Sequence, residues 1–249
     1  MQLFSGHNGT ELSGLTNVND DLVDSLVATT EHTSGPPSKV QALFLRRIET
    51  GKLEVVQRIV LHEDNRNATT FARWPAGNVL CAGWGSTTLH ELCRSRKGSQ
   101  LPFEDKPREH RLPANVRVIC GLQSNGECRL AATFDDDTLR VFRIVGGALS
   151  ELQRVPPPYS RWSPWSLVAL PGGSLIVRSG FVHPEMSLMY CIECCAVQPD
   201  GSLSAPKRLL AQKLGISVWG LLIPTEAFSN HRIVVFNETR ELCLYPIQP

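Results

Sequence analysis

The sequence predicts an all-β protein built from repeated hairpins. The clearest observation is the stretch 128–155, where strand-like apolar segments are separated by three aspartates at 135–137 and by a glycine pair at 146–147. Apolar and charged residues alternate along 139–143, which is typical of a strand with one buried and one solvated face. The glycine pair suits the positive φ of a tight hairpin turn. The stretch therefore predicts three antiparallel strands joined by two short turns.

Two sets of turn residues recur at a similar spacing. Turn glycines stand at positions 51, 147 and 201, which fits a period near 48 to 54 if one copy is degenerate. The turns that precede the second strands begin at positions 75, 124, 171 and 224, so they are 49, 47 and 53 residues apart. A repeat of this length made of four short strands is the period of a propeller blade. The predicted fold is a β-propeller of about five four-stranded antiparallel blades.

The expected strands follow the chain in order. Blades one to five would use 40–48 and 53–61; 69–74, 79–84 and 87–94; 116–123 and the strands of 128–155; 165–170, 174–179, 187–197 and 203–210; 218–223, 232–236 and 241–245. The fourth strand of blade two is obscured by a charged insertion at 95–112. Blade five shows three strands, so the ring closes with an N-terminal strand, or it belongs to a larger ring or is completed by another chain.

Two domains are expected, a segment 1–38 and a propeller domain 39–249. The first segment is rich in Gly, Asn, Asp, Ser and Thr, and only 22–28 has the pattern of a strand. It would be a degenerate first half-blade or closure strand, or a flexible lead-in. A closure strand would matter because an open propeller exposes a sheet edge.

The turn and strand at 136–142 resemble the WD40-like β-propeller family, with Phe142 and Arg143 where that family has its Trp-Asp pair. In such blades a His, a Ser or Thr, the turn Asp and the Trp form a buried hydrogen-bonded set. The resemblance implies that His110, Thr133 and Asp136 fill three of these four places. It also implies a non-enzymatic scaffold that binds another protein or peptide.

Composition excludes several classes of function. The 249 residues carry a formal net charge of +1, which argues against duplex nucleic acid as a partner. No apolar run is long enough for a membrane span, and the first residues lack a signal-peptide pattern. The eight cysteines lie mostly in apolar strand patterns, where they behave as small buried residues. Reduced thiols in a cytoplasmic or nuclear protein are the expected state.

Patterns for catalysis, metals or cofactors are scarce. Cys191 and Cys194 form a C-x-x-C, but no second pair stands at zinc spacing, and the two residues project to opposite faces of a strand. The three aspartates are better explained as a turn in which one Asp accepts backbone hydrogen bonds than as a calcium loop. Hydrolase-elbow, P-loop and dinucleotide motifs are absent. The sequence therefore predicts no cofactor, no metal and no enzymatic activity, and an enzyme with a tunnel site ranks last.

Two loops supply the candidate binding residues. Loops on a rigid scaffold often carry function, and Tyr, Trp and Arg are enriched at interface hot spots. The predicted contacts lie in the insertion and in the irregular connection after residue 155; they are Lys106, Arg108, His110, Tyr159, Arg161 and Trp162. Two alternatives stay open, a lectin-like five-bladed propeller that binds glycans and the substrate-receiving propeller of a ubiquitin-ligase adaptor.

Overall fold

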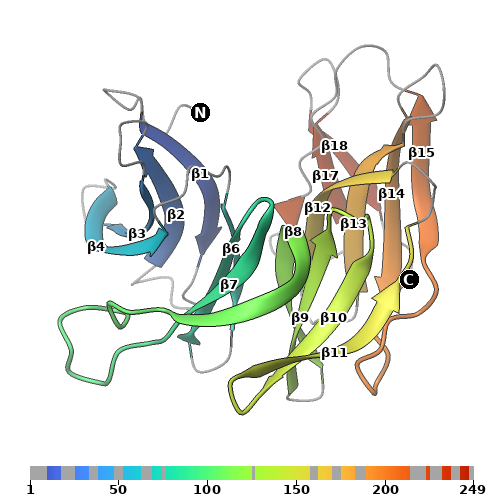
Figure 1. The fold of residues 1–249 in the computed structure, drawn as a ribbon. Coiled ribbons are helices and arrows are strands. Elements are labelled where there is room, and N and C mark those ends of the chain that lie inside the picture. The colour runs from blue at the N-terminus through green and yellow to red at the C-terminus, as the bar shows by residue number, and fades with distance from the viewer. Residues whose placement is uncertain are drawn as a thin grey trace. The chain divides into compact units, whose positions relative to one another are not determined.

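The computed structural model describes the chain as a succession of β-strands (Figure 1). The described residues are 10–17, 26–33, 39–47, 53–62, 69–74, 77–124, 127–157, 162–169, 175–182, 189–213, 223–224, 232–236 and 242–246. Contacts divide the chain into two compact units, Met1–Val116 and Arg117–Pro249, and each is described by itself. Within the described ranges no helix is long and apolar enough to cross a membrane.

The first sheet of unit 1 is a four-stranded antiparallel meander. Its strands are β1 (Thr10–Asn17), β2 (Leu26–Thr33), β3 (Lys39–Arg47) and β4 (Leu53–His62), hydrogen-bonded in chain order. Alternation decides which face of β4 is buried: Ile59 and Leu61 are buried, whereas Arg58 and Val60 are exposed. β1 and β2 lie in the segment 1–38, and the domain division predicted at residue 38 stays a prediction.

The second sheet of unit 1 begins with three short strands. They are β5 (Thr69–Arg73), β6 (Val79–Gly83) and β7 (Ser86–Leu92), again antiparallel. A tight turn joins β6 to β7, and its Gly85 has φ 75°, a conformation that favours glycine. All five residues of β6 are buried, which marks it as a central strand of the sheet.

The strand β8 (Arg108–Ser124) is 17 residues long and crosses the boundary between the units. Its first part pairs with β7, from Arg108 opposite Glu91 to Val116 opposite Ser86. Farther along, β8 is the neighbour of β9 (Glu127–Phe134) in the strand order. The charged insertion therefore ends at residue 107, because the run from 108 onward already alternates: His110 and Leu112 are buried, and the residues between and beside them are exposed.

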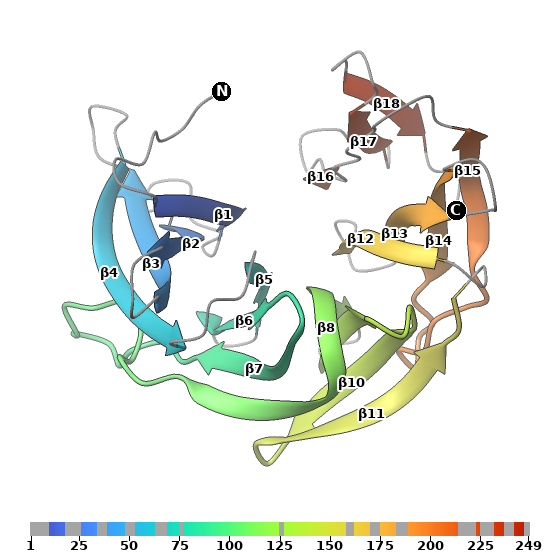
Figure 2. The same ribbon diagram turned by 45° about the horizontal axis from the view of Figure 1, so that its top comes forward.

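Unit 2 continues the same antiparallel pattern. Its remaining strands are β10 (Leu139–Val145), β11 (Ala148–Val155), β12 (Trp162–Ala169), β13 (Leu175–Val182), β14 (Met189–Ala196), β15 (Lys207–Lys213), β16 (Ile223–Pro224), β17 (Arg232–Phe236) and β18 (Leu242–Pro246). Figure 2 shows β12 to β15 side by side in chain order, and β16 to β18 form a three-stranded sheet. The all-β, antiparallel class predicted from the sequence is confirmed.

Each unit has its own hydrophobic core. In unit 1 the buried cluster draws on both sheets and includes Phe44, Ile59, Phe71, Val79 and Phe103. In unit 2 the cluster joins the sheet of β9 to β11 with that of β12 to β15, and it consists of Cys120, Leu122, Ala131, Leu139, Val141, Val155, Leu167, Cys195 and Leu203. Apolar burial of this kind is the main stabilising term in folding.

A glutamine on the last strand of one sheet grips the backbone of the next sheet in each unit. In unit 1, Gln57 Nε2 donates to Phe103 O at 2.7 Å, and Phe103 N donates to Gln57 Oε1 at 2.9 Å. In unit 2, Gln153 Nε2 donates to Leu203 O at 2.9 Å, and Leu203 N donates to Gln153 Oε1 at 2.6 Å. We call these two paired interactions the unit 1 clasp and the unit 2 clasp. Each satisfies one buried or part-buried N–H and C=O that no strand ladder supplies.

Candidate functional site

The turn between β9 and β10 carries the three aspartates and is held by its backbone. Phe134 N donates to Thr138 O at 3.1 Å, and Asp137 N donates to Phe134 O at 3.0 Å. Asp137 has φ 62°, and it is the non-glycine residue with positive φ among the described residues. A residue with a side chain adopts this conformation at a cost, and Asp tolerates it better than most.

Asp136 is fully engaged in holding the turn. Its Oδ1 accepts from Thr138 N at 3.1 Å and from Thr138 Oγ1 at 2.6 Å, and its Oδ2 pairs with Arg140 Nη2. Burial raises the pKa of this carboxyl, but the hydrogen bonds from Thr138 and Arg140 and the charge of Arg140 outweigh it, so the pKa lies below its usual value. Asp136 is therefore an ionised, structural carboxylate.

Asp137 has a different environment from its neighbour. Its Oδ1 lies 3.7 Å from Arg117 Nη2, too far for a hydrogen bond, and that oxygen has no hydrogen-bond partner among the described residues. The side chains of Arg117 and Asp137 are 19% and 24% exposed, so solvent reaches both. Burial raises the pKa of the Asp137 carboxyl, the charge of Arg117 opposes this, and Asp136 and Asp135 add to it. The net upward shift makes Asp137 a stronger base than an ordinary aspartate.

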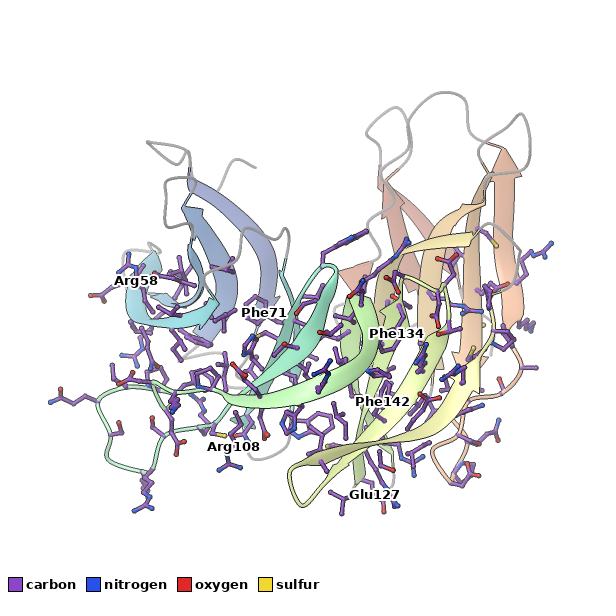
Figure 3. All side chains as sticks on the ribbon, viewed as in Figure 1. Arg58, Phe71, Arg108, Glu127, Phe134 and Phe142 are labelled. Carbon is purple, nitrogen blue, oxygen red and sulfur yellow. The ribbon has the colours of Figure 1, made fainter. Side chains whose placement is uncertain are left out.

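The hydrogen-bonded set implied by the WD40 resemblance is not assembled. His110 Nε2 lies 3.0 Å from Glu91 Oε2 in unit 1, whereas Asp136 bonds Thr138 and Arg140 in unit 2. The Thr133 hydroxyl is buried and has no hydrogen-bond partner among the described residues. Phe142 packs edge-on against Phe134, with ring centroids 5.9 Å apart. Both residues are labelled in Figure 3. A polar tetrad is thus replaced by an aromatic contact and separate ion pairs.

The pair of His110 and Glu91 is buried. Asn78 Nδ2 donates to Glu91 Oε1 at 2.9 Å, and Asn78 Oδ1 accepts from Arg94 N at 2.8 Å. The side chains of His110 and Glu91 are only 3% and 8% exposed. A histidine beside a carboxylate can act in catalysis, but both of these side chains are buried, and their hydrogen bonds explain why they tolerate burial.

The predicted binding residues fall into separate groups. Lys106 and Arg108 are exposed, and His110 is buried against Glu91. Tyr159 and Arg161 lie outside the described residues, and Trp162 is the first residue of β12, with its side chain outside the description. The role of these six residues in binding a partner stays a prediction.

The cysteines have the properties of packing residues. The described ones are free thiols, among which Cys81, Cys120 and Cys191 are buried. Burial raises the pKa of Cys120 to about 12 and that of Cys195 to about 11, so their reactive thiolate forms are suppressed. In the described part of the chain no group of three or more His, Cys, Asp or Glu side chains could hold a metal ion.

Comparisons with known proteins point to one kind of fold. Neither protein-family models nor curated proteins gave a match. Among solved structures, the chain resembles the periplasmic gluconolactonase PpgL of Pseudomonas aeruginosa, with a TM-score of 0.61, 14% identity and coverage of 95% of this chain and 66% of that one. A Bacteroides uniformis protein assigned as a 6-phosphogluconolactonase gives a TM-score of 0.59 at 10% identity, covering 94% and 80%. Sqt1 of Chaetomium thermophilum gives 0.53 at 13%, covering 96% and 72%.

These likenesses correct three predictions. The chain has the propeller-like fold of the lactonases, which match with higher TM-scores than Sqt1, so the WD40 resemblance is wrong. That resemblance rested on the turn at 136–142, but there Asp136 bonds Thr138 and Arg140 and not the residues that the family would pair with it. The predicted non-enzymatic scaffold and the predicted absence of enzymatic activity are also contradicted, because the Pseudomonas and Bacteroides neighbours are both named as enzymes. At such low identity the likeness shows the fold alone.

Sequence reasoning found the aspartate turn but missed its partner. It assigned the turn to one hydrogen-bonding Asp, which describes Asp136, and gave Asp137 no role of its own. Arg117 lies in the middle of β8, 20 positions before Asp137, and no local pattern joins the two. The available signal was the presence of three aspartates in a turn for which one hydrogen-bonding Asp is enough.

Proposed function

We propose that the protein is an enzyme that hydrolyses the lactones of sugar acids, with Asp137 and Arg117 as its reacting groups. The observation that carries this proposal is the partly exposed pair of a carboxylate with a raised pKa and a guanidinium 3.7 Å away. The lactone class is supported by the fold, since a gluconolactonase and a protein assigned as a 6-phosphogluconolactonase resemble the chain over nearly all its length. Perturbed carboxylates beside a cation are typical of catalytic sites.

Hydrolysis of a lactone needs a general base and a group that stabilises the oxyanion, and Asp137 and Arg117 fit these two roles. Asp137 takes a proton from a water molecule as its oxygen attacks the lactone carbonyl carbon, which gives a tetrahedral oxyanion. Arg117 donates hydrogen bonds to that oxyanion and stabilises its charge. The ring C–O bond then breaks, and the protonated Asp137 returns its proton to the departing alkoxide oxygen. The product is the open-chain hydroxy acid, and the enzyme regains its starting protonation state.

Three other described carboxylates fit this role less well. Glu91 and Glu193 are buried in pairs with His110 and Arg178, and Asp136 is taken up by the turn. Each of these acids is already bonded and would have to break that bond before accepting a proton. Asp137 Oδ1 lies 3.7 Å from a guanidinium nitrogen and has no hydrogen bond within the described residues that would have to be broken first.

The sheets are proposed to be the blades of a five-bladed β-propeller. Counting β8 as the last strand of the second blade and the first of the third gives four-stranded blades up to β15, followed by the three strands β16 to β18. The support is the repeated antiparallel meander together with the likeness to the two lactonases. In this arrangement the turn from β9 to β10 joins the second and third strands of the third blade.

The proposal is tested by base uptake at constant pH, with glucono-δ-lactone and 6-phosphogluconolactone as substrates and the uncatalysed rate subtracted. The wild-type protein should accelerate the opening of at least one of them. Asp137→Asn should lower kcat about 100- to 10,000-fold, the usual loss on removing a general base. Asp135→Asn is the comparison variant: Asp135 is exposed in the same turn and acts on Asp137 through its charge alone, so its replacement should change kcat far less. An unaccelerated reaction with both lactones, or full activity in Asp137→Asn, would reject the assignment.

A further inference from the structure

We infer that Asp136, Thr138 and Arg140 form a positioning device that holds Asp137 facing Arg117, an inference that rests on the proposed function. The three residues surround Asp137 in sequence and are linked to one another by side-chain hydrogen bonds. Asp137 itself takes no part in that network. They are positioning residues, since none of them would contact the substrate.

The network fixes the backbone on both sides of Asp137. Asp136 Oδ1 accepts from both the amide and the hydroxyl of Thr138, so the residues before and after Asp137 are tied together. Asp137 N donates to Phe134 O at 3.0 Å. These bonds hold Asp137 at its φ of 62°. A left-handed residue with a side chain persists where its surroundings impose it, and such residues cluster at functional sites.

Arg140 anchors the turn to the body of unit 2. Its side chain is 5% exposed, and Nε donates to Thr138 Oγ1 at 2.9 Å. The guanidinium carbon lies 4.5 Å from the centroid of the Phe134 ring, and Nη1 lies 3.6 Å from Glu151 Oε2 on β11. Thr138 thus receives one hydrogen bond from Arg140 and donates one to Asp136. A planar guanidinium stacked on an aromatic ring has a defined orientation, which a lysine would not reproduce.

The two neighbouring aspartates consequently divide the work. The pKa of Asp136 is lowered by its bonds to Thr138 and Arg140, and it stays ionised as the fixed end of the turn. Asp137 faces Arg117, with Asp135 and Asp136 as the other charges acting on it, and its pKa is raised. Without the network, Asp137 would be free to leave the left-handed region of φ. Its distance from Arg117 and the exposed fraction of its side chain would then change.

The test uses Thr138→Val, which keeps the shape of Thr138 and removes its hydroxyl. Thr138→Ser should restore the hydroxyl and the wild-type behaviour, and Thr87→Val, at an exposed threonine of β7, is the matched control. The first readout is a ¹³C NMR titration of the Asp137 carboxyl, assigned with Asp137→Asn. The second is the steady-state hydrolysis of glucono-δ-lactone. We expect Thr138→Val to move the titration midpoint of Asp137 and to lower kcat at least tenfold with KM within about twofold.

The outcomes are distinguishable. If Thr138→Val is less stable but leaves the Asp137 titration and kcat unchanged, the network is merely structural and the inference fails. If the wild type hydrolyses no lactone, the proposed function fails, and the carboxyl titration alone still decides whether the network positions Asp137. Should Thr138→Val not fold, Arg140→Lys gives the same two readouts, since it keeps the charge and loses the bond to Thr138 and the stacking on Phe134.

Discussion

Each unit contains a glutamine clasp, but the residue that the glutamine binds differs: it is Phe103 in unit 1 and Leu203 in unit 2. We call these two residues the anchors. In both units the glutamine lies beside a β-bulge on the last strand of a sheet. It binds the backbone of a residue 46 or 50 positions farther along the chain. That residue lies in the connection between the third and fourth strands of the next sheet. That residue also forms an isolated bridge, Arg94 with Phe103 in unit 1 and Val197 with Leu203 in unit 2. The recurrence indicates that the chain repeats in pairs of sheets as well as sheet by sheet.

The anchors differ in what surrounds them. In unit 1, the Phe103 ring lies 4.2 Å from the Phe44 ring, and Arg94 stands 5.0 Å from the Phe103 centroid. Leu203, in unit 2, joins an aliphatic core. The turn before it places Gly201 against the Arg129 guanidinium, so closely that an added Cβ would clash with it. The comparison shows that a polar clasp fixes the register, while the nature of the buried side chain is free to vary.

His110 occupies the corresponding place on β8, and the contact described for it is of another kind. It stands opposite Leu89 and before an arginine, as Gln57 stands opposite Phe44 and Gln153 opposite Val141. It bonds Glu91 within its own sheet instead. The sheet that follows joins β10 to β11 by a tight turn at Gly146 and Gly147, so it has no long connection for a clasp to hold.

The largest expected effect comes from removing the anchors. Phe103→Ala should destabilise unit 1 by about 3 to 5 kcal/mol, because a fully buried aromatic side chain leaves a cavity. Leu203→Ala should cost unit 2 less, within about 2 to 5 kcal/mol, since it loses no contact between rings. Hydrogen exchange measured by mass spectrometry separates the two units. Equal losses of protection in both units after either change would contradict the assignment of each anchor to its own unit.

Removing the clasps should have the next largest effect. Gln57→Leu and Gln153→Leu leave a backbone N–H and C=O without partners, which costs about 1 to 3 kcal/mol. The cost should be greater at Gln57, which is buried, than at Gln153, which is partly exposed and leaves its partner groups nearer to water. Arg58→Leu is the matched control for Gln57→Leu. Faster exchange of the Phe103 amide in Gln57→Leu, without change at Leu203, is the expected readout; an unchanged Phe103 amide would show that the clasp is dispensable.

The contact between Gly201 and Arg129 gives a smaller, conditional effect. Gly201 has φ 76°, so Gly201→Ala should cost about 1 to 2 kcal/mol for the backbone alone, plus the displacement of Arg129. Gly147→Ala is the control, because Gly147 has φ 83° and a Cβ added there would meet no atom within 4 Å. Thermal unfolding of single and double variants should show that Arg129→Ala relieves part of the loss in Gly201→Ala and none of that in Gly147→Ala. Additive double variants would exclude the predicted clash.

The smallest expected effect is a pH dependence of opposite sign at the two aspartates. The lowered pKa of Asp136 means that its carboxylate stabilises the fold above its ordinary value of 3.8, and that this stability is lost as the pH falls through the lower folded value. The raised pKa of Asp137 means that ionisation opposes folding, so Asp137→Asn should be slightly stabilising at neutral pH. Unfolding midpoints across the acid range would test both signs, and a loss of stability in Asp137→Asn at neutral pH would contradict the second.

Local pattern was enough for most of the strands, though not for β1 (Thr10–Asn17), which was not predicted, and it was not enough for the site. Alternation around 139–143 and the glycine turn at 146–147 predicted β10 and β11, because burial of one face and a positive φ leave marks in neighbouring residues. The start of β8 was hidden because charged residues on the exposed face resemble a loop. The clasps and the pair of Arg117 and Asp137 join residues far apart in sequence, and a lone glutamine or arginine carries no sign of its partner.

The most direct test of the central claim is the pH dependence of kcat/KM for glucono-δ-lactone in the wild type and in Arg117→Gln. The activity should fall with decreasing pH through a midpoint above the ordinary aspartate value of 3.8, because the pKa of the free-enzyme base Asp137 is raised. Since Arg117 lowers that pKa, its removal should move the midpoint to still higher pH and reduce the plateau. An acid limb that stays in place in Arg117→Gln would contradict the claim that Asp137 and Arg117 form the reacting pair.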